Sequence, residues 1–424
     1  MLKHHLMVTS MATAIALTGC GGGGGSNGGG NTTNTQPTLR ASNFQAADYV
    51  IGQPDFITSD SPSEGGGLAA TDSGYPYAGA GFGNGVLYLA DYDHERVRGF
   101  TSMPTSNNPT PDFVIGQPDF SSSNPGTGAN EMEGPQSPVV AGNKLFITEY
   151  DNNRVTIYSP APTSGPASAT LVLGQNDFGT KNPDCSASGM SSPEVLTVAG
   201  DKLIVSDSEN NRVLIWNSIP TENGQAADVV LGQADFDNCD ENRGSTVAAD
   251  TLYQPTGLWS DGTRLVVQDS DNSRTLIWNT FPTSNGQPAD LVLGQDDFSH
   301  STSNDDDQDG SNDGMPTNRT MSDPYNGVAS NGDWLMLTDT GNHRVLVWTD
   351  FPTSNFQSAD LVLGQGDFSH STPNDDDQDG SDDGTPSART FDDPSGLTLA
   401  QGRYLIVSDN ENQRYLVFDL AKQE

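Results

Sequence analysis

Two loops in the last third of the chain carry the densest set of side chains that could bind a ligand. They read SHSTSNDDDQDGSNDG at 299–314 and SHSTPNDDDQDGSDDG at 369–384. In each loop, aspartates alternate with single residues up to a glycine, and another aspartate follows three residues later. Alternating carboxylates around a sharp turn can surround a hard cation with roughly six to eight oxygens. The candidate metal ligands are Asp305, Asp307, Asp309, Asp313, Asp375, Asp377, Asp379 and Asp383.

This aspartate pattern resembles the calcium loops of EF-hands and of thrombospondin type 3 repeats. It departs from the EF-hand at the twelfth position, where Pro316 and Pro386 replace the bidentate glutamate. The resemblance implies calcium as the cofactor at one or both loops, bound more weakly or with an oxygen from another loop. The alternative is a solvated acidic loop without a cation. His300 and His370 precede the acidic runs, and an exposed histidine is usually not a ligand.

The overall charge limits the classes of partner. The chain has 56 Asp and Glu against 18 Lys and Arg, for a formal net charge of −38. Nucleic-acid binding depends largely on Lys and Arg, and anionic lipid attracts basic segments, so neither is an expected partner of the folded body. The sequence contains no H-E-x-x-H, no G-x-S-x-G and no phosphate-binding glycine loop. We expect an unidentified protein or carbohydrate partner, no organic cofactor, and a monomer.

The elements that position these loops come from a repeat. An apolar strand ending in Gly-Gln, then one residue and Asp-Phe, occurs six times, with the phenylalanine at 56, 120, 178, 236, 298 and 368. A second phrase alternates with it and consists of an apolar strand, an acidic residue, a short turn and an arginine. Its arginines are Arg96, Arg154, Arg212, Arg274, Arg344 and Arg414. A period of 58–70 residues indicates a repeat architecture.

Each unit consists of four short apolar segments bounded by Gly, Pro, Asn and Asp, as is typical of β-strands. A proline leads into the first strand of every unit, at Pro76, Pro135, Pro193, Pro255, Pro324 and Pro394. Four antiparallel strands repeated radially form a β-propeller, so we predict an all-β, six-bladed propeller over 47–420. The body starts with a strand of the fourth type and ends after the third. The N-terminal strand should therefore complete the last blade and close the ring.

The turn phrase resembles the signature of NHL repeats, and the resemblance covers all six units. Its best copies contain the structural turn residues Asp207, Asn210, Arg212, Asp339, Asn342 and Arg344. It weakens where His94 replaces the turn asparagine and where Glu149 replaces the aspartate. The resemblance implies an NHL-type propeller. An aspartate or asparagine satisfies turn amides and an arginine bridges a carboxylate and carbonyls, so we interpret these turns as structural locks rather than a functional arginine ring.

The resemblance also supplies an enzymatic alternative. Some NHL-type propellers are metal-dependent lyases and related six-bladed propellers include lactonases, with histidine and acidic ligands in the central channel. No histidine of the body falls on an innermost strand here, so no channel ligands can be matched. Fold alone does not transfer function. Whether the chain is an enzyme therefore stays open, and a non-catalytic role is favoured.

The topology predicts a common face for the variable loops. In four-stranded antiparallel blades, the connection between blades and the turn between strands two and three emerge on the same side. The acidic loops, the arginine turns and the loops with Cys185 and Cys239 should therefore share one face, which is the candidate partner surface. An exported protein could join these two cysteines in a disulfide, and two free thiols are the alternative.

The N-terminal segment predicts export. Residues 1–19 combine a basic start with an apolar stretch that is too short to span a bilayer and is typical of a signal peptide. Their end resembles a bacterial lipobox, which implies a lipid on Cys20; an ordinary cleavable signal is the alternative. Residues 20–46 are rich in Gly, Ser and Asn and predict a flexible tether. Gly21 after the cysteine favours the outer membrane by the same resemblance.

Together these patterns predict a lipid-anchored propeller of the bacterial cell envelope whose only membrane contact is the N-terminal lipid. Its expected role is a non-catalytic binding or scaffold module stabilised by calcium. The alternative is a metal-dependent enzyme of the lyase or lactonase type with its site in the central channel.

Overall fold

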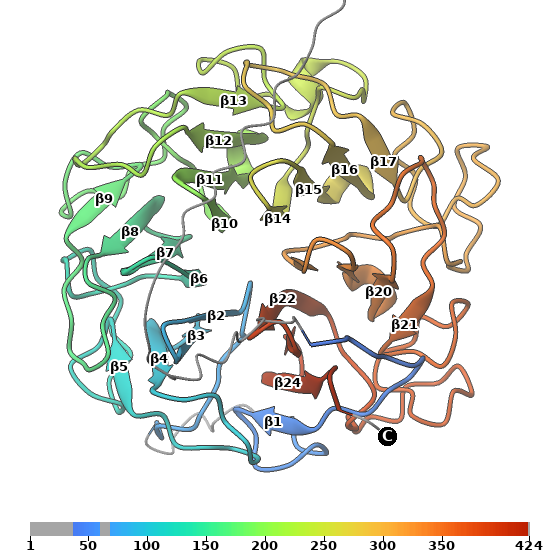
Figure 1. Cartoon of the computed structure of the whole chain (residues 1–424), viewed down its shortest axis with the longest axis horizontal. Coiled ribbons are helices and arrows are strands. Elements are labelled where there is room, and N and C mark those ends of the chain that lie inside the picture. The colour runs from blue at the N-terminus through green and yellow to red at the C-terminus, as the bar shows by residue number, and fades with distance from the viewer. Residues whose placement is uncertain (1–36, 60–67, 423–424) are drawn as a thin grey trace, which may run out of the picture. The chain divides into compact units, whose positions relative to one another are not determined.

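The chain folds into six four-stranded antiparallel sheets set around a central axis, as Figure 1 shows. The computed structural model describes residues 37–59 and 68–422. The architecture confirms the predicted all-β, six-bladed propeller. Helical structure in the described residues is limited to four short 3-10 turns: η1 (Ser208–Asn210), η2 (Glu241–Gly244), η3 (Ser270–Asn272) and η4 (Thr340–Asn342).

The blades follow one another along the chain, each running from its innermost to its outermost strand. The first has β2 (Ala80–Gly83), β3 (Val86–Asp91), β4 (Arg96–Phe100) and β5 (Phe113–Ile115). The second has β6 (Pro135–Ala141), β7 (Lys144–Glu149), β8 (Arg154–Tyr158) and β9 (Leu171–Leu173). The third has β10 (Pro193–Ala199), β11 (Lys202–Asp207), β12 (Arg212–Trp216) and β13 (Val229–Leu231).

The remaining blades repeat the order, with one change in the last. The fourth has β14 (Pro255–Ser260), β15 (Leu265–Asp269), β16 (Arg274–Trp278) and β17 (Leu291–Leu293). The fifth has β18 (Val328–Ser330), β19 (Leu335–Asp339), β20 (Arg344–Trp348) and β21 (Leu361–Leu363). The sixth has β22 (Pro394–Ala400), β23 (Tyr404–Asp409) and β24 (Arg414–Asp419), and takes its outer strand, β1 (Tyr49–Ile51), from the start of the body.

The N-terminal strand closes the ring, as the order of the repeats predicts. β1 pairs antiparallel with β24, with Val50 opposite Leu416. The residues just before it also contact the last blade: the Arg40 amide donates to the Leu420 carbonyl at 2.7 Å, and Leu39 is buried in the core cluster there. The segment at 37–46, assigned to the tether by its composition, therefore contributes to the propeller because it carries an apolar side chain that this cluster buries.

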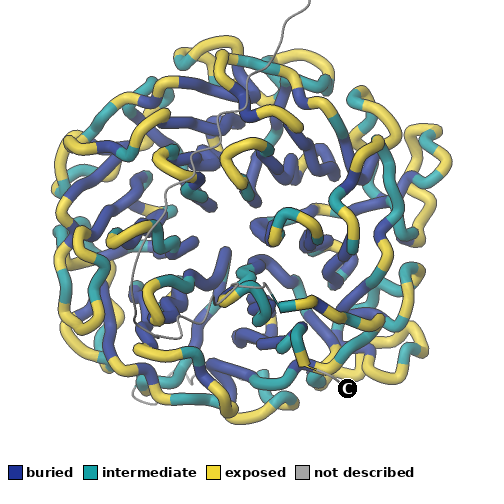
Figure 2. The backbone as a smooth tube through the Cα atoms, viewed as in Figure 1, coloured by how far each residue is buried: buried dark blue, intermediate teal, exposed yellow. Residues whose placement is uncertain are grey.

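The core lies between neighbouring blades rather than at a single centre. One cluster combines Phe146 of the second blade with Leu196 and Trp216 of the third, and the other blade pairs are joined in the same way. In Figure 2 the buried strands form the body of each blade and the exposed segments lie in the connecting loops. A core distributed in this way allows a unit of more than 300 residues, which a single core seldom supports.

The Gly-Gln phrase is part of this framework. All six glycines have positive φ, from 84° to 99°, and a Cβ on Gly232 would lie 2.6 Å from Leu252. Only glycine adopts this conformation without strain. The glutamine that follows ties two segments together: in the third blade, Gln233 Nε2 donates to the carbonyls of Asn211 and Asp240, both at 2.9 Å.

Candidate functional site

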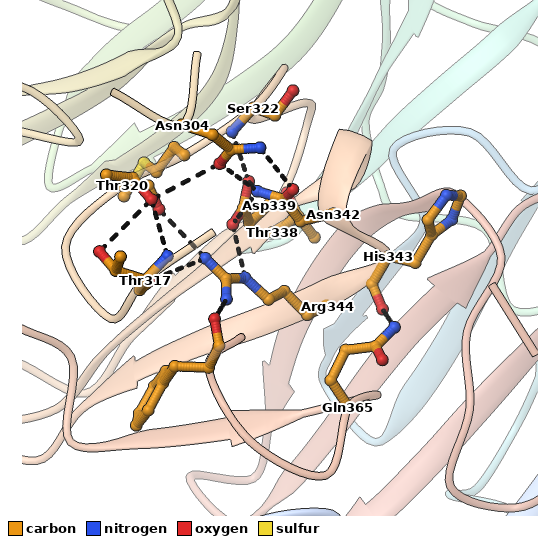
Figure 3. A network of polar contacts seen from close by, with 12 residues as sticks. Asn304, Thr317, Thr320, Ser322, Thr338, Asp339, Asn342, His343, Arg344 and Gln365 are labelled. Carbon is orange, nitrogen blue, oxygen red and sulfur yellow. Dashed lines mark hydrogen bonds and ion pairs between the residues drawn. The ribbon is translucent and has the colours of Figure 1, made fainter. Parts of the chain in front are cut away.

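Each blade is locked by a buried arginine at the turn between its second and third strands. Figure 3 shows the lock of the fifth blade. Arg344 Nε donates to Asp339 Oδ2 at 2.7 Å, and Asn342 Nδ2 donates to both oxygens of the same carboxylate. The third blade repeats this with Arg212 Nε, which lies 2.6 Å from Asp207 Oδ2, and with Asn210.

The same arginines bind the next Gly-Gln phrase. Arg344 Nη1 donates to the carbonyl of Phe368 at 2.6 Å, and its Nη2 donates to the carbonyls of Thr317 and Thr320. In every blade, Nη1 donates to the phenylalanine carbonyl of the phrase that ends the outer strand. All six arginines are completely buried. Their guanidinium groups donate their hydrogen bonds to partners inside the protein, so the six arginines have a structural role.

The two departures from the turn pattern keep the lock. In the first blade, His94 Nδ1 lies 2.7 Å from Asp91 Oδ1 and takes the place of the asparagine. The pKa of Asp91 is lowered to about 2: burial alone would raise it, but His94 and two arginines, Arg98 and Arg96, outweigh burial. In the second blade, the longer Glu149 still accepts from Arg154 Nε at 2.9 Å.

The acidic loops gather three of their four predicted ligands. Carboxylate oxygens of Asp305, Asp307 and Asp313 all lie within 4.8 Å of one another, and those of Asp375, Asp377 and Asp383 repeat the arrangement. Asp305 is buried, and its carboxylate accepts from the amides of Asp309 and Gly310. The fourth aspartates, Asp309 and Asp379, lie outside these two groups and cap the turns instead, through the amides of Ser311 and Ser381.

Repulsion among these carboxylates raises the pKa of one aspartate in each loop. Asp309 is the main cause of a raised pKa at Asp307, with further contributions from burial and from Asp313 and Asp305. In the other loop, Asp379 is the main cause of a raised pKa at Asp377. A cation bound between these carboxylates would reduce the repulsion that raises their pKa.

The acidic loops are fixed to the arginine locks, on the same face of the propeller. Asn304 and Asn342 exchange two side-chain hydrogen bonds, at 2.9 and 3.0 Å, and Asn374 and Asn412 do the same in the last blade. The residue before the ligand Asp305 is thus held by the turn that Arg344 anchors. A rigid first ligand reduces the ordering that cation binding would require.

The histidines near the acidic runs lie outside the aspartate groups. His300 Nδ1 is 3.0 Å from both Asp296 and Asp297, and His370 pairs with Asp367 at 2.8 Å. A further histidine group, which the sequence did not suggest, joins His343 to Asp392 and Asp393 of the next blade. His343 Nδ1 already accepts a hydrogen bond from the Asp393 amide at 3.1 Å, so that nitrogen has its partner within the chain.

The two cysteines of the body form a disulfide. Cys185 and Cys239 lie in successive connections between blades, with their Cα atoms 6.3 Å apart. The bond therefore links the loops before the third and fourth blades, and Asn211 of the arginine turn donates to the Cys239 carbonyl at 2.9 Å. Cys20, the predicted lipidation site, and residues 1–19 lie outside the described residues.

The central channel contains a cavity of about 240 Å³ between the innermost strands. Its walls carry aliphatic and aromatic groups with hydroxyls and one carboxamide, including Val139, Leu258, Trp259, Ser137 and Asn326. Among the described residues, this lining contains no imidazole and no carboxylate. The described wall of this cavity therefore does not supply a set of converging ligands for a metal ion.

One feature of the channel was missed in the sequence. The residue after each leading proline is polar in all six blades but takes five different identities, with tyrosine occurring twice, unlike its repeated neighbours. Four of these positions are buried: Gln136, Glu194, Thr256 and Ser395. A variable polar residue at a fixed position of a repeat was the available signal.

Comparisons with known proteins gave matches among solved structures alone. A scan against protein families and a search of curated proteins found no match. Among solved structures, the chain is similar to a catalytically inactive variant of virginiamycin B lyase from Staphylococcus aureus with quinupristin, with a TM-score of 0.43 and 10% identity over 91% of this chain and 98% of that one. A streptogramin B lyase follows, with 0.40 and 10% over 82% and 95%. The computationally designed Ika8 protein gives 0.38 and 9% over 88% and 100%.

No helix among the described residues is both long and apolar enough to cross a membrane.

Proposed function

We propose that this chain is an exported, lipid-anchored propeller of the bacterial cell envelope that acts as a non-catalytic binding or scaffold module. Calcium bound in the two acidic loops stabilises its binding face, which takes a protein or carbohydrate partner. The observation that carries this proposal is the convergence of three carboxylates in each acidic loop, on the face that also holds the disulfide loops. Loops that depart from a rigid repeated framework are where propellers and similar scaffolds place binding groups.

The geometry of the loops supports a calcium role. In each loop, three carboxylates already lie within 4.8 Å of one another, and the exposed Asp307 and Asp313 leave the group open to solvent on one side. Calcium accepts flexible coordination that includes carbonyls and water, so the missing twelfth-position glutamate lowers the affinity without excluding the site. The apolar and hydroxyl lining of the channel cavity favours this binding role over metal-assisted chemistry inside the channel.

The test is a thermal-unfolding series with and without Ca²⁺. The wild-type midpoint should rise on adding Ca²⁺, and the combined Asp307→Ala and Asp377→Ala variant should lose that rise. The matched control combines Asp201→Ala and Asp333→Ala, since both aspartates are exposed in hairpins that follow innermost strands. Calorimetry showing no binding to the wild type would refute the calcium role.

The binding role is tested separately. Residues 37–424 serve as bait in a pull-down from the native envelope, with and without Ca²⁺. The wild-type bait and its Asp201→Ala, Asp333→Ala control should recover the same partner. Recovery should fall with the loop variant. Hydrolysis or elimination of a candidate substrate by the purified body would instead favour the enzymatic alternative.

A further inference from the structure

The face of the arginine turns surrounds one end of the central channel, and polar residues of the innermost segments lie at this end. We call the six residues that follow the leading prolines the throat ring; they are Tyr77, Gln136, Glu194, Thr256, Tyr325 and Ser395. Four of them are the second residues of the innermost strands β6, β10, β14 and β22. The lining of the channel cavity includes the residues that directly follow three members of the ring: Ala78, Ser137 and Asn326.

Two residues of the throat ring from different blades, Tyr325 and Glu194, are joined by a side-chain hydrogen bond. Tyr325, which precedes β18, lies within electrostatic range of Glu194 on β10, Tyr150 of the second blade and Tyr77 of the first. Burial and these neighbours raise the pKa of Tyr325 well above its usual value. Glu194 in turn accepts side-chain hydrogen bonds from Tyr325 and Asn326. The ring therefore brings its one carboxylate and its two phenol groups near one another at this end of the channel.

Three buried acceptor atoms of the throat ring make no hydrogen bond to any described residue. They are Glu194 Oε2, Gln136 Oε1 and Ser395 Oγ. These three residues are only 4%, 2% and 1% exposed. A buried polar group without a partner is costly, so three such acceptors at one end of the channel indicate that a ligand or ordered water fills their bonding capacity.

The backbone that presents these atoms is held rigidly by the neighbouring blades. The Glu194 carbonyl accepts from Thr148 Oγ1 at 2.6 Å, and the next amide, of Val195, donates to Ser206 Oγ at 2.9 Å. On the far side, the Asn326 amide donates to Thr256 Oγ1 at 3.1 Å. The unpartnered side chains thus project from fixed positions, which is the arrangement expected of a formed binding site.

The charge around the throat selects a cation. Acidic side chains from several blades surround the ring, and burial raises the pKa of Asp271, Asp323 and Asp393. Glu209 and Asp271 raise the pKa of Glu194 further. Acidic groups around a narrow opening concentrate positively charged ligands.

The ligand groups favour an organic ammonium over a metal ion. Only Glu194 supplies a carboxylate within the ring; the other side chains carry one carboxamide, two aliphatic hydroxyls and two phenols. Calcium is usually held by several carboxylates among its oxygen ligands. An ammonium needs about three acceptors, and its charge is also stabilised by aromatic faces such as those of Tyr77 and Tyr325. The adjoining cavity of about 240 Å³ has room for a short alkyl chain.

We propose that the throat ring binds the charged group of a small organic amine, with Glu194, Gln136 and Ser395 accepting its N–H bonds and its alkyl chain entering the channel cavity. This site goes beyond the calcium-stabilised binding face and does not depend on cations in the acidic loops.

The test is calorimetric titration of the full chain at pH 8 with n-butylammonium chloride, and with n-butanol as a neutral probe of similar shape. Butylammonium should bind at one site, and the Glu194→Gln variant should weaken it about tenfold or more, because hydrogen bonds to a charged group contribute about 1.5–3 kcal/mol. The matched control is Glu222→Gln, an exposed residue between β12 and β13, which should leave the affinity unchanged. Equal binding of butanol and butylammonium would overturn the proposal.

Further variants and ligands distinguish the remaining outcomes of this titration. If Glu194→Gln fails to fold, Gln136→Leu should still weaken butylammonium binding severalfold, and unchanged affinity in the folded variants overturns the site. Absence of saturable binding means that the throat holds water only, and displacement by Ca²⁺ means a metal site; either result also overturns it. Repeating the titration in the Asp307→Ala, Asp377→Ala variant separates this outcome from a failure of calcium binding. Comparison with Nα-acetyl-lysine amide distinguishes a free amine from a peptide lysine as the source of the ammonium group.

Discussion

Replacing Arg344 by methionine should destabilise the propeller strongly, because it removes every hydrogen bond that the arginine of one blade lock donates. The guanidinium donates to Asp339 at 2.7 Å and to the carbonyls of Phe368, Thr317 and Thr320 at 2.6, 2.8 and 3.1 Å. Both charged groups are completely buried. Removing one partner of a buried ion pair costs roughly 3–5 kcal/mol, because the remaining charge is uncompensated.

The structure sets the magnitude within that range. Asp339 keeps its bonds from Asn342 and from the Ser322 amide, so part of its charge stays stabilised. The three carbonyls lose their donor, and each unpaired buried acceptor adds to the loss. We therefore expect a decrease of about 4 kcal/mol or more in the free energy of unfolding. Adding Asp339→Asn to Arg344→Met should recover about 2 kcal/mol of this decrease, since no buried charge is then left alone.

The assay is urea unfolding followed by tryptophan fluorescence, for which Trp348 at the end of the same strand is a buried reporter. The control is Lys181→Met, since Lys181 pairs with Glu133 on the surface and is 49% exposed. An exposed pair contributes about 0–1 kcal/mol. If Arg344→Met lowers stability no more than Lys181→Met does, or if Asp339→Asn recovers nothing, the lock is not the stabilising element that its geometry indicates.

Three further predictions follow from the connections between blades and from the channel. Replacing Cys185 and Cys239 by serine should lower the free energy of unfolding by up to about 4 kcal/mol, because the bond closes a loop of 54 residues; unfolding with and without a reductant checks this, and equal midpoints would contradict it. Burial raises the pKa of Glu194 from 4.5 to about 7 in the folded protein. Between these two pH values the folded protein therefore binds one proton more than the unfolded chain. The free energy of unfolding decreases as the pH rises through this interval, by about 3 kcal/mol in all. Glu194→Gln should therefore be more stable than the wild type at pH 8 and equal to it below pH about 4.5, as measured by urea unfolding at both pH values. Asn304→Ala should weaken calcium binding at 299–314 and leave the 369–384 loop unchanged, because only the first loop loses its tie to Asn342; calorimetry should then show one weakened site of two.

Much of the fold was predictable because the sequence repeats it. Local pattern identified the strands, and the alternation of two phrases gave six blades and the closing strand β1. The buried lock was also readable, since an aspartate and an arginine five residues apart at the ends of paired strands must meet, as Asp207 and Arg212 do. The second partner of the arginine, the phenylalanine carbonyl of the Gly-Gln phrase, was not readable, because it lies 24 residues further along.

The candidate sites were likewise predictable from the sequence only in part. The acidic runs were found as local patterns, but the structure brings together only Asp305, Asp307 and Asp313 in the first, while the carboxylate of Asp309 accepts a hydrogen bond from the Ser311 amide. Spacing along a chain does not fix which carboxylates converge, because the backbone of the loop decides it. The disulfide was one of two open alternatives until the loops of adjacent blades placed Cys185 and Cys239 with their Cα atoms 6.3 Å apart.

The sequence by itself determined the repeated parts of this protein, since every blade solves the same local problem with the same residues. Only the tertiary structure decided what the unrepeated residues do. Glu194 and Tyr325 belong to different blades and meet only because six innermost strands converge on one axis. Closure of the ring places them at the throat, where Glu194 Oε2 is buried without a hydrogen-bond partner among the described residues, and such a group is costly unless a ligand or water binds it.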